Sequence, residues 1–222
     1  MKKKYILCIM IFIISILFAG CGNNNVEYVK NRIDSIESTE NIKDGTIDKI
    51  KEEYDSLSNR NKKKVDNYYK LESALESVTS NEINNITIYF NSMNAFSGDT
   101  DSYIFKNKKQ DVQDIIDKYS EYMTDEEKEY ILTILGLCMT EDEVTNKVKE
   151  ELDNPNSFEL EDGKINMYVC GSYYDEETGN KIYHSNLNFT YDADGNTGIE
   201  REMHFLYTLN MEECKVEVDS IF

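Results

Sequence analysis

The stretch ELDNPNSFELEDGKINMYV, residues 151–169, decides the fold, because the spacing of apolar residues changes within it. Before this stretch, apolar side chains recur every three or four residues, which is typical of amphipathic helices. Pro155 is the only proline of the chain and prevents a helix from continuing. From Phe158 onward apolar and polar residues alternate, as they do in half-buried strands. The sequence therefore predicts an α+β fold in which helices precede an antiparallel meander sheet.

Four segments show this alternation, over residues 165–173, 183–191, 199–207 and 215–221. The strongly apolar residues of the first three carry odd numbers, so a register that pairs odd with odd residues keeps them on one face. Such a register pairs Tyr191 with Ile199 and Leu187 with Met203. Residues 194–196 then form a three-residue hairpin loop.

The opening stretch also resembles a C-terminal module of Gram-positive lipoproteins and secreted proteins, in which a helix ends at Asn-Pro-x-Ser-Phe and leads into a sheet. The matching residues are Asn154, Pro155, Ser157 and Phe158. The resemblance implies structural roles for these residues and no activity.

Helical spacing marks three short helices near residues 33–36, 47–57 and 65–75. Each has one apolar stripe to bury, which favours a three-helix bundle. The run TIDKIKEEYDSLSNRNKKKVDNYYKLESAL, residues 46–75, resembles the helical repeats of many Gram-positive surface proteins. This resemblance implies a spacer or an interaction module without catalytic residues. We expect a helical module over residues 26–79 and a second domain over residues 80–222.

The first part of the second domain is less regular. Residues 80–106 include the apolar ITIYF, for which helix and strand both stay open. Residues 112–119 repeat the apolar spacing of residues 47–54, either as a second copy of the module or by chance. Capping boxes at residues 124–127 and 140–143 predict two helix starts, the second for a helix that ends near Leu152.

The N-terminal residues predict export. Lys2, Lys3 and Lys4 precede an apolar run over residues 5–18, which is typical of a signal peptide and too short for a comfortable membrane span. The sequence LFAGC, ending at Cys21, resembles the lipobox of bacterial lipoproteins, although the family more often has Leu in place of Phe18. The resemblance implies removal of residues 1–20, a covalent diacylglycerol on Cys21, and a lipidated tether over residues 21–25. Two acyl chains anchor a protein stably, so we expect it at the extracytoplasmic side of the cell membrane.

Charge and cysteine content narrow the class of protein. The net charge of −19 disfavours binding to nucleic acid. Cys8 leaves with the signal peptide and Cys21 carries the lipid, so Cys138, Cys170 and Cys214 remain. Their odd number argues against a disulfide framework, and a single Cys170–Cys214 bridge stays open.

The polar face of the sheet carries the candidate ligand surface, formed by Tyr168, Tyr174, His184, Asn186, Asn188 and His204. The odd-with-odd register places Cys170 across from Asn186 on this face. Thiols and imidazoles bind transition metals or form thiol–imidazole pairs. Two strand spacings separate Cys170 from His204, however, or roughly 10 Å.

Motifs for catalysis are missing: the sequence has no G-x-S-x-G, H-E-x-x-H, Cys-x-x-Cys or Gly-rich phosphate loop. The segment DADGNTG, residues 192–198, lacks the closing glutamate of a calcium loop, because Met203 takes that position. We expect a non-enzymatic, membrane-anchored lipoprotein with a binding, spacer or interaction role toward an unknown protein or small ligand. The alternative is a metal- or thiol-dependent protein that uses Cys170, His184 and His204.

Overall fold

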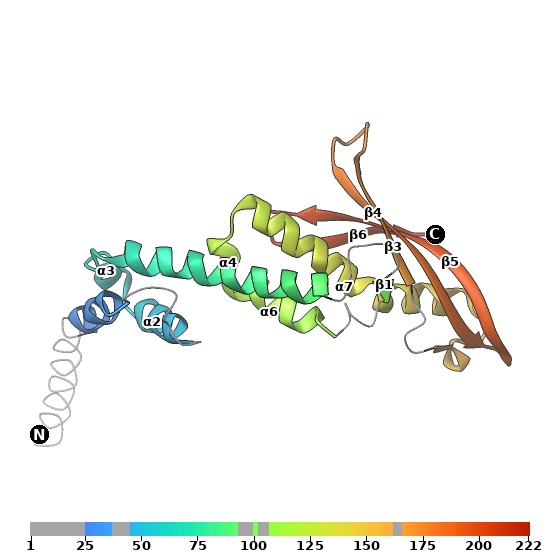
Figure 1. Cartoon of the computed structure of the whole chain (residues 1–222), viewed down its shortest axis with the longest axis horizontal. Coiled ribbons are helices and arrows are strands. Elements are labelled where there is room, and N and C mark those ends of the chain that lie inside the picture. The colour runs from blue at the N-terminus through green and yellow to red at the C-terminus, as the bar shows by residue number, and fades with distance from the viewer. Residues whose placement is uncertain (1–24, 37–44, 93–99, 102–106, 162–165) are drawn as a thin grey trace, which may run out of the picture. The chain divides into compact units, whose positions relative to one another are not determined.

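A computed structural model of the chain describes residues 25–36, 45–92, 100–101, 107–161 and 166–222, with only the backbone of residues 100–101, 141 and 166–170. The predicted α+β fold is confirmed, since helices come first and an antiparallel sheet follows (Figure 1). The chain divides into two compact units, one ending at Val78 and the other beginning at Thr79. The predicted signal peptide and the lipidation site Cys21 lie outside the described residues.

The first unit is helical. Its helices span residues 25–34, α2 (Thr46–Asp55), α3 (Asn59–Lys62) and the N-terminal part of α4 (Tyr68–Ser92). Ile33, Ile50 and Leu71 come from three of these helices and are fully buried. Their apolar stripes therefore meet in one small core, which is what holds short helices in place.

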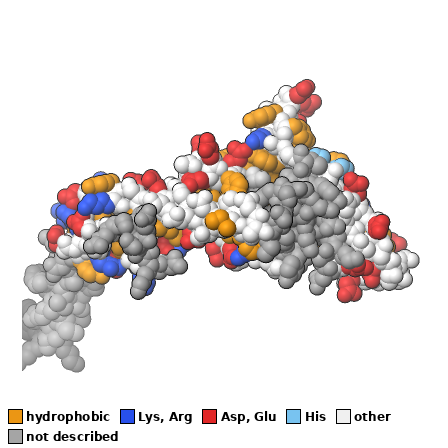
Figure 2. All heavy atoms as spheres, in the orientation of Figure 1, with side chains coloured by type: hydrophobic (Ala, Val, Ile, Leu, Met, Phe, Trp, Pro, Cys, Tyr) orange, Lys and Arg blue, Asp and Glu red, His pale blue; other side chains and the backbone are white. Residues whose placement is uncertain are grey.

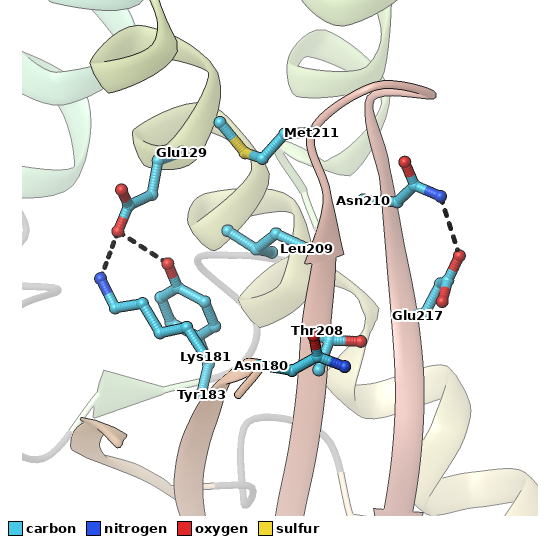
Figure 3. A pocket seen from close by; sticks show the side chains of 9 residues that line it. All are labelled: Glu129, Asn180, Lys181, Tyr183, Thr208, Leu209, Asn210, Met211 and Glu217. Carbon is cyan, nitrogen blue, oxygen red and sulfur yellow. Dashed lines mark hydrogen bonds and ion pairs between the residues drawn. The ribbon is translucent and has the colours of Figure 1, made fainter. Parts of the chain in front are cut away.

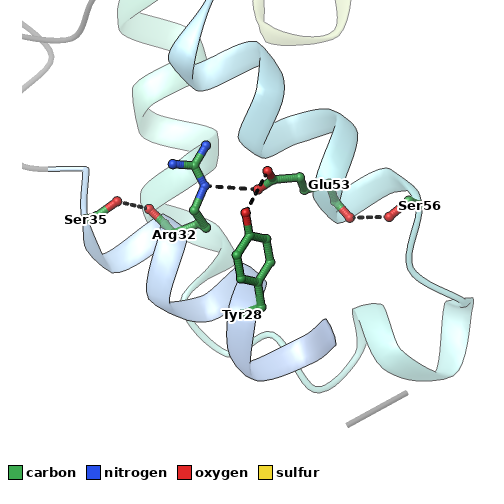
Figure 4. A network of polar contacts seen from close by, with 5 residues as sticks. All are labelled: Tyr28, Arg32, Ser35, Glu53 and Ser56. Atoms are coloured by element: carbon green, nitrogen blue, oxygen red, sulfur yellow. Dashed lines mark hydrogen bonds and ion pairs between the residues drawn. The ribbon is translucent and has the colours of Figure 1, made fainter. Parts of the chain in front are cut away.

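Polar contacts add to this core at the edge of the first unit (Figure 4). The Glu53 carboxylate accepts hydrogen bonds from the Tyr28 hydroxyl at 3.2 Å and from the Arg32 guanidinium at 3.1 Å. Asn67 donates to the backbone carbonyl of Lys30 at 2.9 Å, which joins the start of α4 to the first helix.

Helix α4 includes the segment ITIYF, for which the sequence favoured neither helix nor strand. Ile83, Ile86 and Phe90 are buried and lie three and four residues apart, so they form one stripe along the helix. The β-branched residues of this segment favour a strand, but burial of the apolar stripe against the rest of the fold stabilises the helix instead.

Among the described residues that follow α4, the α-helices of the second unit are α6 (Lys109–Tyr119) and α7 (Asp125–Glu151). The capping box at the start of α7 is confirmed: Thr124 accepts from the Glu127 backbone N–H at 3.2 Å, and Glu127 accepts from that of Thr124 at 2.9 Å. The helix start predicted at residues 140–143 is wrong, because α7 runs through it. Thr140 is buried, and its hydroxyl bonds to the Gly136 carbonyl one turn earlier instead of capping a helix.

The sheet has six strands in the described chain, and all of them except β1 follow α7. They are β1 (Thr100–Asp101), β2 (Glu159–Leu160), β3 (Asn166–Tyr174), β4 (Lys181–Ala193), β5 (Asn196–Asn210) and β6 (Lys215–Ile221). The order is β1-β3-β4-β5-β6, with β2 paired to β4, and every pairing is antiparallel. The predicted register is confirmed: Tyr191 pairs with Ile199 and Leu187 with Met203.

Helix α7 contacts β5 and β6. The odd-numbered residues Leu187, Met203, Phe205 and Tyr207 are fully or almost fully buried. Gly136 of α7 lies directly against the Tyr207 ring, where an added Cβ would be 2.5 Å from a ring carbon. The odd-numbered face is therefore the core of the second unit, and the even-numbered face points away from it.

The β4–β5 hairpin differs from the prediction in its loop. Ala193 pairs with Asn196, which leaves only Asp194 and Gly195 in the turn. Both have positive φ angles, 51° and 83°, which is the signature of a type I′ turn. The predicted three-residue loop is wrong because a bulge between Tyr191 and Ala193 shifts the register just before the turn.

The residues that resemble the C-terminal module hold this hairpin. Pro155–Ser157 forms a 3-10 turn after α7, and the Ser157 hydroxyl accepts a hydrogen bond from the Asp194 backbone N–H at 2.8 Å. The Phe158 ring lies 5.5 Å from the Tyr191 ring between centroids. These contacts join the end of α7 to the tip of the sheet.

Candidate functional site

Two histidines meet on the sheet face that points away from α7. His184 of β4 and His204 of β5 lie on adjacent strands, with Nε2 of the first 3.0 Å from Nδ1 of the second. The ring centroids are 5.2 Å apart. The two nitrogens share one hydrogen bond, whose direction depends on the tautomers of the rings.

Three further predicted site residues line up with the histidines. Asn186 pairs directly with His204, Asn188 lies two positions farther along β4, and Tyr168 pairs with Asn186 through the backbone. Directly opposed residues of an antiparallel pair share a face. Asn186 and Asn188 are therefore on the face of the histidines, whereas the side chain of Tyr168 lies outside the described residues.

Two predicted placements on β3 are wrong. Asn186 pairs with Tyr168, so the register differs by two residues from the one that put Cys170 opposite Asn186. A bulge then interrupts the pairing. Val169 pairs with Ser185 and Gly171 with His184, so Cys170 has no residue opposite it and is not across from Asn186. Beyond the bulge the alternation of β3 is inverted. Tyr174 pairs with Lys181 and so lies on the opposite face from the histidines.

The bulge brings an unpredicted residue, Tyr173, onto this face, opposite Ile182. Phe222 is a second unpredicted member: it exchanges backbone hydrogen bonds with His204, and its ring stacks on the imidazole at 5.1 Å. The sequence signal for Tyr173 was Gly171, since an isolated glycine inside a strand indicates a bulge. To predict Phe222 on this face, the β5–β6 register would have to be known. A second bulge between Leu206 and Tyr207 shifts that register.

We call this surface the histidine face. It comprises Tyr173, Ile182, His184, Asn186, Asn188, His204, Leu206, Ser220 and Phe222. Figure 2 shows the histidine side chains at the molecular surface. Phe222 is 63% exposed and Tyr173 is 47% exposed, while the central residues are half-buried.

The nine described residues of the histidine face include no Asp, Glu, Lys or Arg, but Glu202 lies on the same side of the sheet, opposite Asn188 and two positions from His204. Charged residues appear around it. Glu202 pairs with Asn188, Glu200 with Thr190, and Glu217 with Thr208. Near Glu217, partial burial raises the pKa of Asp219, and the charge of Glu217 raises it further. The result is an uncharged centre with an acidic rim.

Metal-binding groups are sparse. Within the described part of the chain, no group of three His, Cys, Asp or Glu side chains could hold a metal ion. Cys214 is a free thiol, so the Cys170–Cys214 bridge is not formed. Cys138 is buried, which raises the pKa of its thiol to about 12. Asn186 is different, because its side-chain oxygen is buried and has no hydrogen-bond partner in the described structure.

A pocket of about 360 Å³ lies where β4 begins, β5 ends and β6 begins (Figure 3). Its charged groups bond to one another. The Glu129 carboxylate accepts from Lys181 at 2.5 Å and from the Tyr183 hydroxyl at 2.7 Å. Lys181, followed by Tyr183, lowers the pKa of Glu129. Glu217 accepts from Asn210 at 3.2 Å. These charged groups of the pocket therefore already have partners within it.

Comparison with known proteins adds no relative. No family model, curated protein or solved structure matches this chain. The lipobox, helical-repeat and C-terminal-module resemblances stay predictions.

Proposed function

We propose that this chain is an extracytoplasmic lipoprotein, anchored to the cell membrane through Cys21, that binds a protein partner through its histidine face and has no catalytic role. The observation that carries the proposal is the uncharged centre of this face, flanked by exposed aromatic residues, in a strongly acidic chain. Tyr173 and Phe222 are the exposed aromatic residues among the described members of the face, and they lie on either side of its half-buried central residues.

The composition of the face is that of a binding interface. The cores of protein interfaces are depleted of charged residues and enriched in aromatic ones, and their rims are polar. The histidine face has this arrangement, with Glu200, Glu202 and Glu217 outside the uncharged centre. A solvated sheet face is expected to be polar, so the exposed rings of Tyr173 and Phe222 are the feature that a partner would explain.

The acidic rim identifies the class of partner. A protein with a basic rim around an apolar or polar centre would complement Glu200, Glu202 and Glu217. A second copy of this chain would place acidic rims against each other, and like charges in an interface cost binding energy. We therefore expect a heterotypic complex with a basic protein.

The experiment places a photo-crosslinking amino acid at Asn188 of the full chain in cells. The matched control is Asn81, an exposed asparagine on α4 in the same unit. We expect one discrete adduct from position 188 and none from position 81. Glu200→Lys with Glu202→Lys should reduce the adduct at least about threefold, because rim charges set the rate of association.

Three outcomes contradict the proposal. Equal adducts from positions 188 and 81 would mean that crosslinking reports random encounters. If the double charge reversal leaves the amount of adduct unchanged, the partner does not recognise the acidic rim. An adduct with the mass of two copies of this chain would replace the basic partner by self-association.

A further inference from the structure

We propose that His184 and His204 form a binding site for a divalent late first-row transition metal, with Cu²⁺ preferred, and that Asn186 supplies a third ligand. The site lies on the histidine face but does not rest on partner binding, since it follows from the two rings and the neighbouring amide. It replaces the thiol that the sequence suggested, because Cys170 lies in the β3 bulge without a residue opposite it.

The separation of the two nitrogens carries the proposal. Imidazole nitrogens bind such metals at about 2.0–2.1 Å, which places two cis ligands about 2.9 Å apart at a right angle and about 3.3 Å apart at the tetrahedral angle. Nε2 of His184 and Nδ1 of His204 are 3.0 Å apart. In the hydrogen-bonded pair the two nitrogens point at each other, so each ring would turn by about 40° for both lone pairs to converge on one ion.

The unsatisfied amide oxygen of Asn186 is the second, independent observation. It is buried, and no described group donates a hydrogen bond to it. Burying a carbonyl oxygen without a partner costs free energy, so such a group in a folded protein calls for an explanation. Asn186 is directly opposite His204 and two residues from His184 on the same face. This oxygen would coordinate a metal ion bound between the two rings.

The rings are held before any ion binds. Phe222 stacks on His204 at 5.1 Å and accepts a hydrogen bond from its backbone N–H at 2.8 Å. Both histidines sit inside paired strands. The strands thus fix the backbone positions of both histidines, and an acidic chain attracts cations to its surface.

The proton balance is simple. In the neutral pair, one ring donates the proton that lies between His184 Nε2 and His204 Nδ1. When the metal takes both nitrogens, that proton moves to the other nitrogen of the same ring, so each ring keeps one proton and stays neutral. If the pair carries an additional proton, binding releases it to water.

The ligand set selects the metal. Two imidazoles and an amide oxygen suit Cu²⁺, Ni²⁺ and Zn²⁺ better than Mg²⁺ or Ca²⁺, which prefer oxygen ligands alone. Among divalent ions, affinity at such sites peaks at Cu²⁺. We expect water to fill the other positions.

The test uses the full chain in a non-chelating detergent, with Cys170→Ser and Cys214→Ser to remove thiol binding. Cu²⁺ is titrated by calorimetry, and the number of bound nitrogens is read from the electron paramagnetic resonance spectrum. We expect one equivalent with two nitrogen ligands. His184→Asn and His204→Asn should each remove one nitrogen and weaken binding at least about a hundredfold, the upper end of what the loss of an outer-shell group costs.

The matched control is Asn188→Ala, on the same strand and face, which should leave the affinity unchanged, while Asn186→Ala weakens it. Circular dichroism verifies that each variant is folded; should one histidine variant not fold, the other decides. Binding that is equal in wild type and in the double histidine variant overturns the proposal, as does the absence of an equivalent with two nitrogens. Neither result involves a partner, so this proposal fails separately from the partner site.

Discussion

At the scale of single residues, the closest contact between helix and sheet depends on a missing Cβ. Gly136 of α7 faces the ring of Tyr207, which is 1% exposed and therefore has no room to move away. A Cβ at position 136 would lie 2.5 Å from one ring carbon and 2.8 Å from another. Gly136→Ala should therefore destabilise the second unit by about 1–2 kcal/mol, since overpacking outweighs the helix propensity of alanine. Denaturant unfolding measures the change.

The control for this prediction is Asn146→Ala, an exposed position of the same helix, which should leave stability the same or slightly higher. If Gly136→Ala were as stable as the Asn146 variant, α7 would not be seated on the Tyr207 ring as described.

At the scale of elements, Glu129 joins α7 to β4 through Lys181 and Tyr183. The Lys181 ammonium, followed by the Tyr183 hydroxyl, lowers the pKa of Glu129. A carboxylate with a lowered folded-state pKa stabilises the protein above its ordinary titration range, and this contribution is lost as the pH falls through the lowered value. Glu129→Gln should thus cost about 0.5 kcal/mol at pH 7, the scale of a solvent-screened ion pair, and almost nothing near pH 2.

Urea unfolding at both pH values measures this difference. Glu176→Gln, in the exposed β3–β4 turn, controls for the loss of one negative charge. A Glu129→Gln cost that is the same at both pH values would show that the ionised carboxylate does not join the two elements.

The two capping boxes show when a local sequence motif is sufficient to predict the start of a helix. Both capping boxes satisfy the same sequence rule, yet only Thr124 starts a helix. Residues 125–139 already form a helix whose buried side chains include Ile131 and Leu135, so at Thr140 the backbone N–H groups have helical partners and need no cap. A motif signals a helix start only where the preceding residues are not helical.

At the scale of the whole molecule, the proposed lipid anchor makes the next prediction. Cells fed labelled palmitate should label the wild-type protein and retain it in the membrane fraction, because two acyl chains bind stably. Cys21→Ala should abolish the label and the retention. Among the described residues, no helix has the length and apolar character that crossing a membrane requires.

Cys214→Ala provides the control, since this thiol belongs to the folded second unit and its loss should leave labelling intact. Palmitate on the Cys21→Ala variant, or an unlabelled wild-type protein, would contradict the anchor.

The sequence by itself determined what depends on neighbours along the chain. The alternation of β4 and β5 placed the apolar residues on one face and both histidines on the other, and Pro155 marked the end of the helices. Only the tertiary structure decided what depends on pairing across the sheet. The bulge at Cys170 exchanges Tyr173 for Tyr174 on the histidine face, and the β6 register brings Phe222 to His204. The physical reason is that side-chain periodicity is local, whereas register is set by hydrogen bonds between distant residues, and one unpaired residue inverts every position that follows.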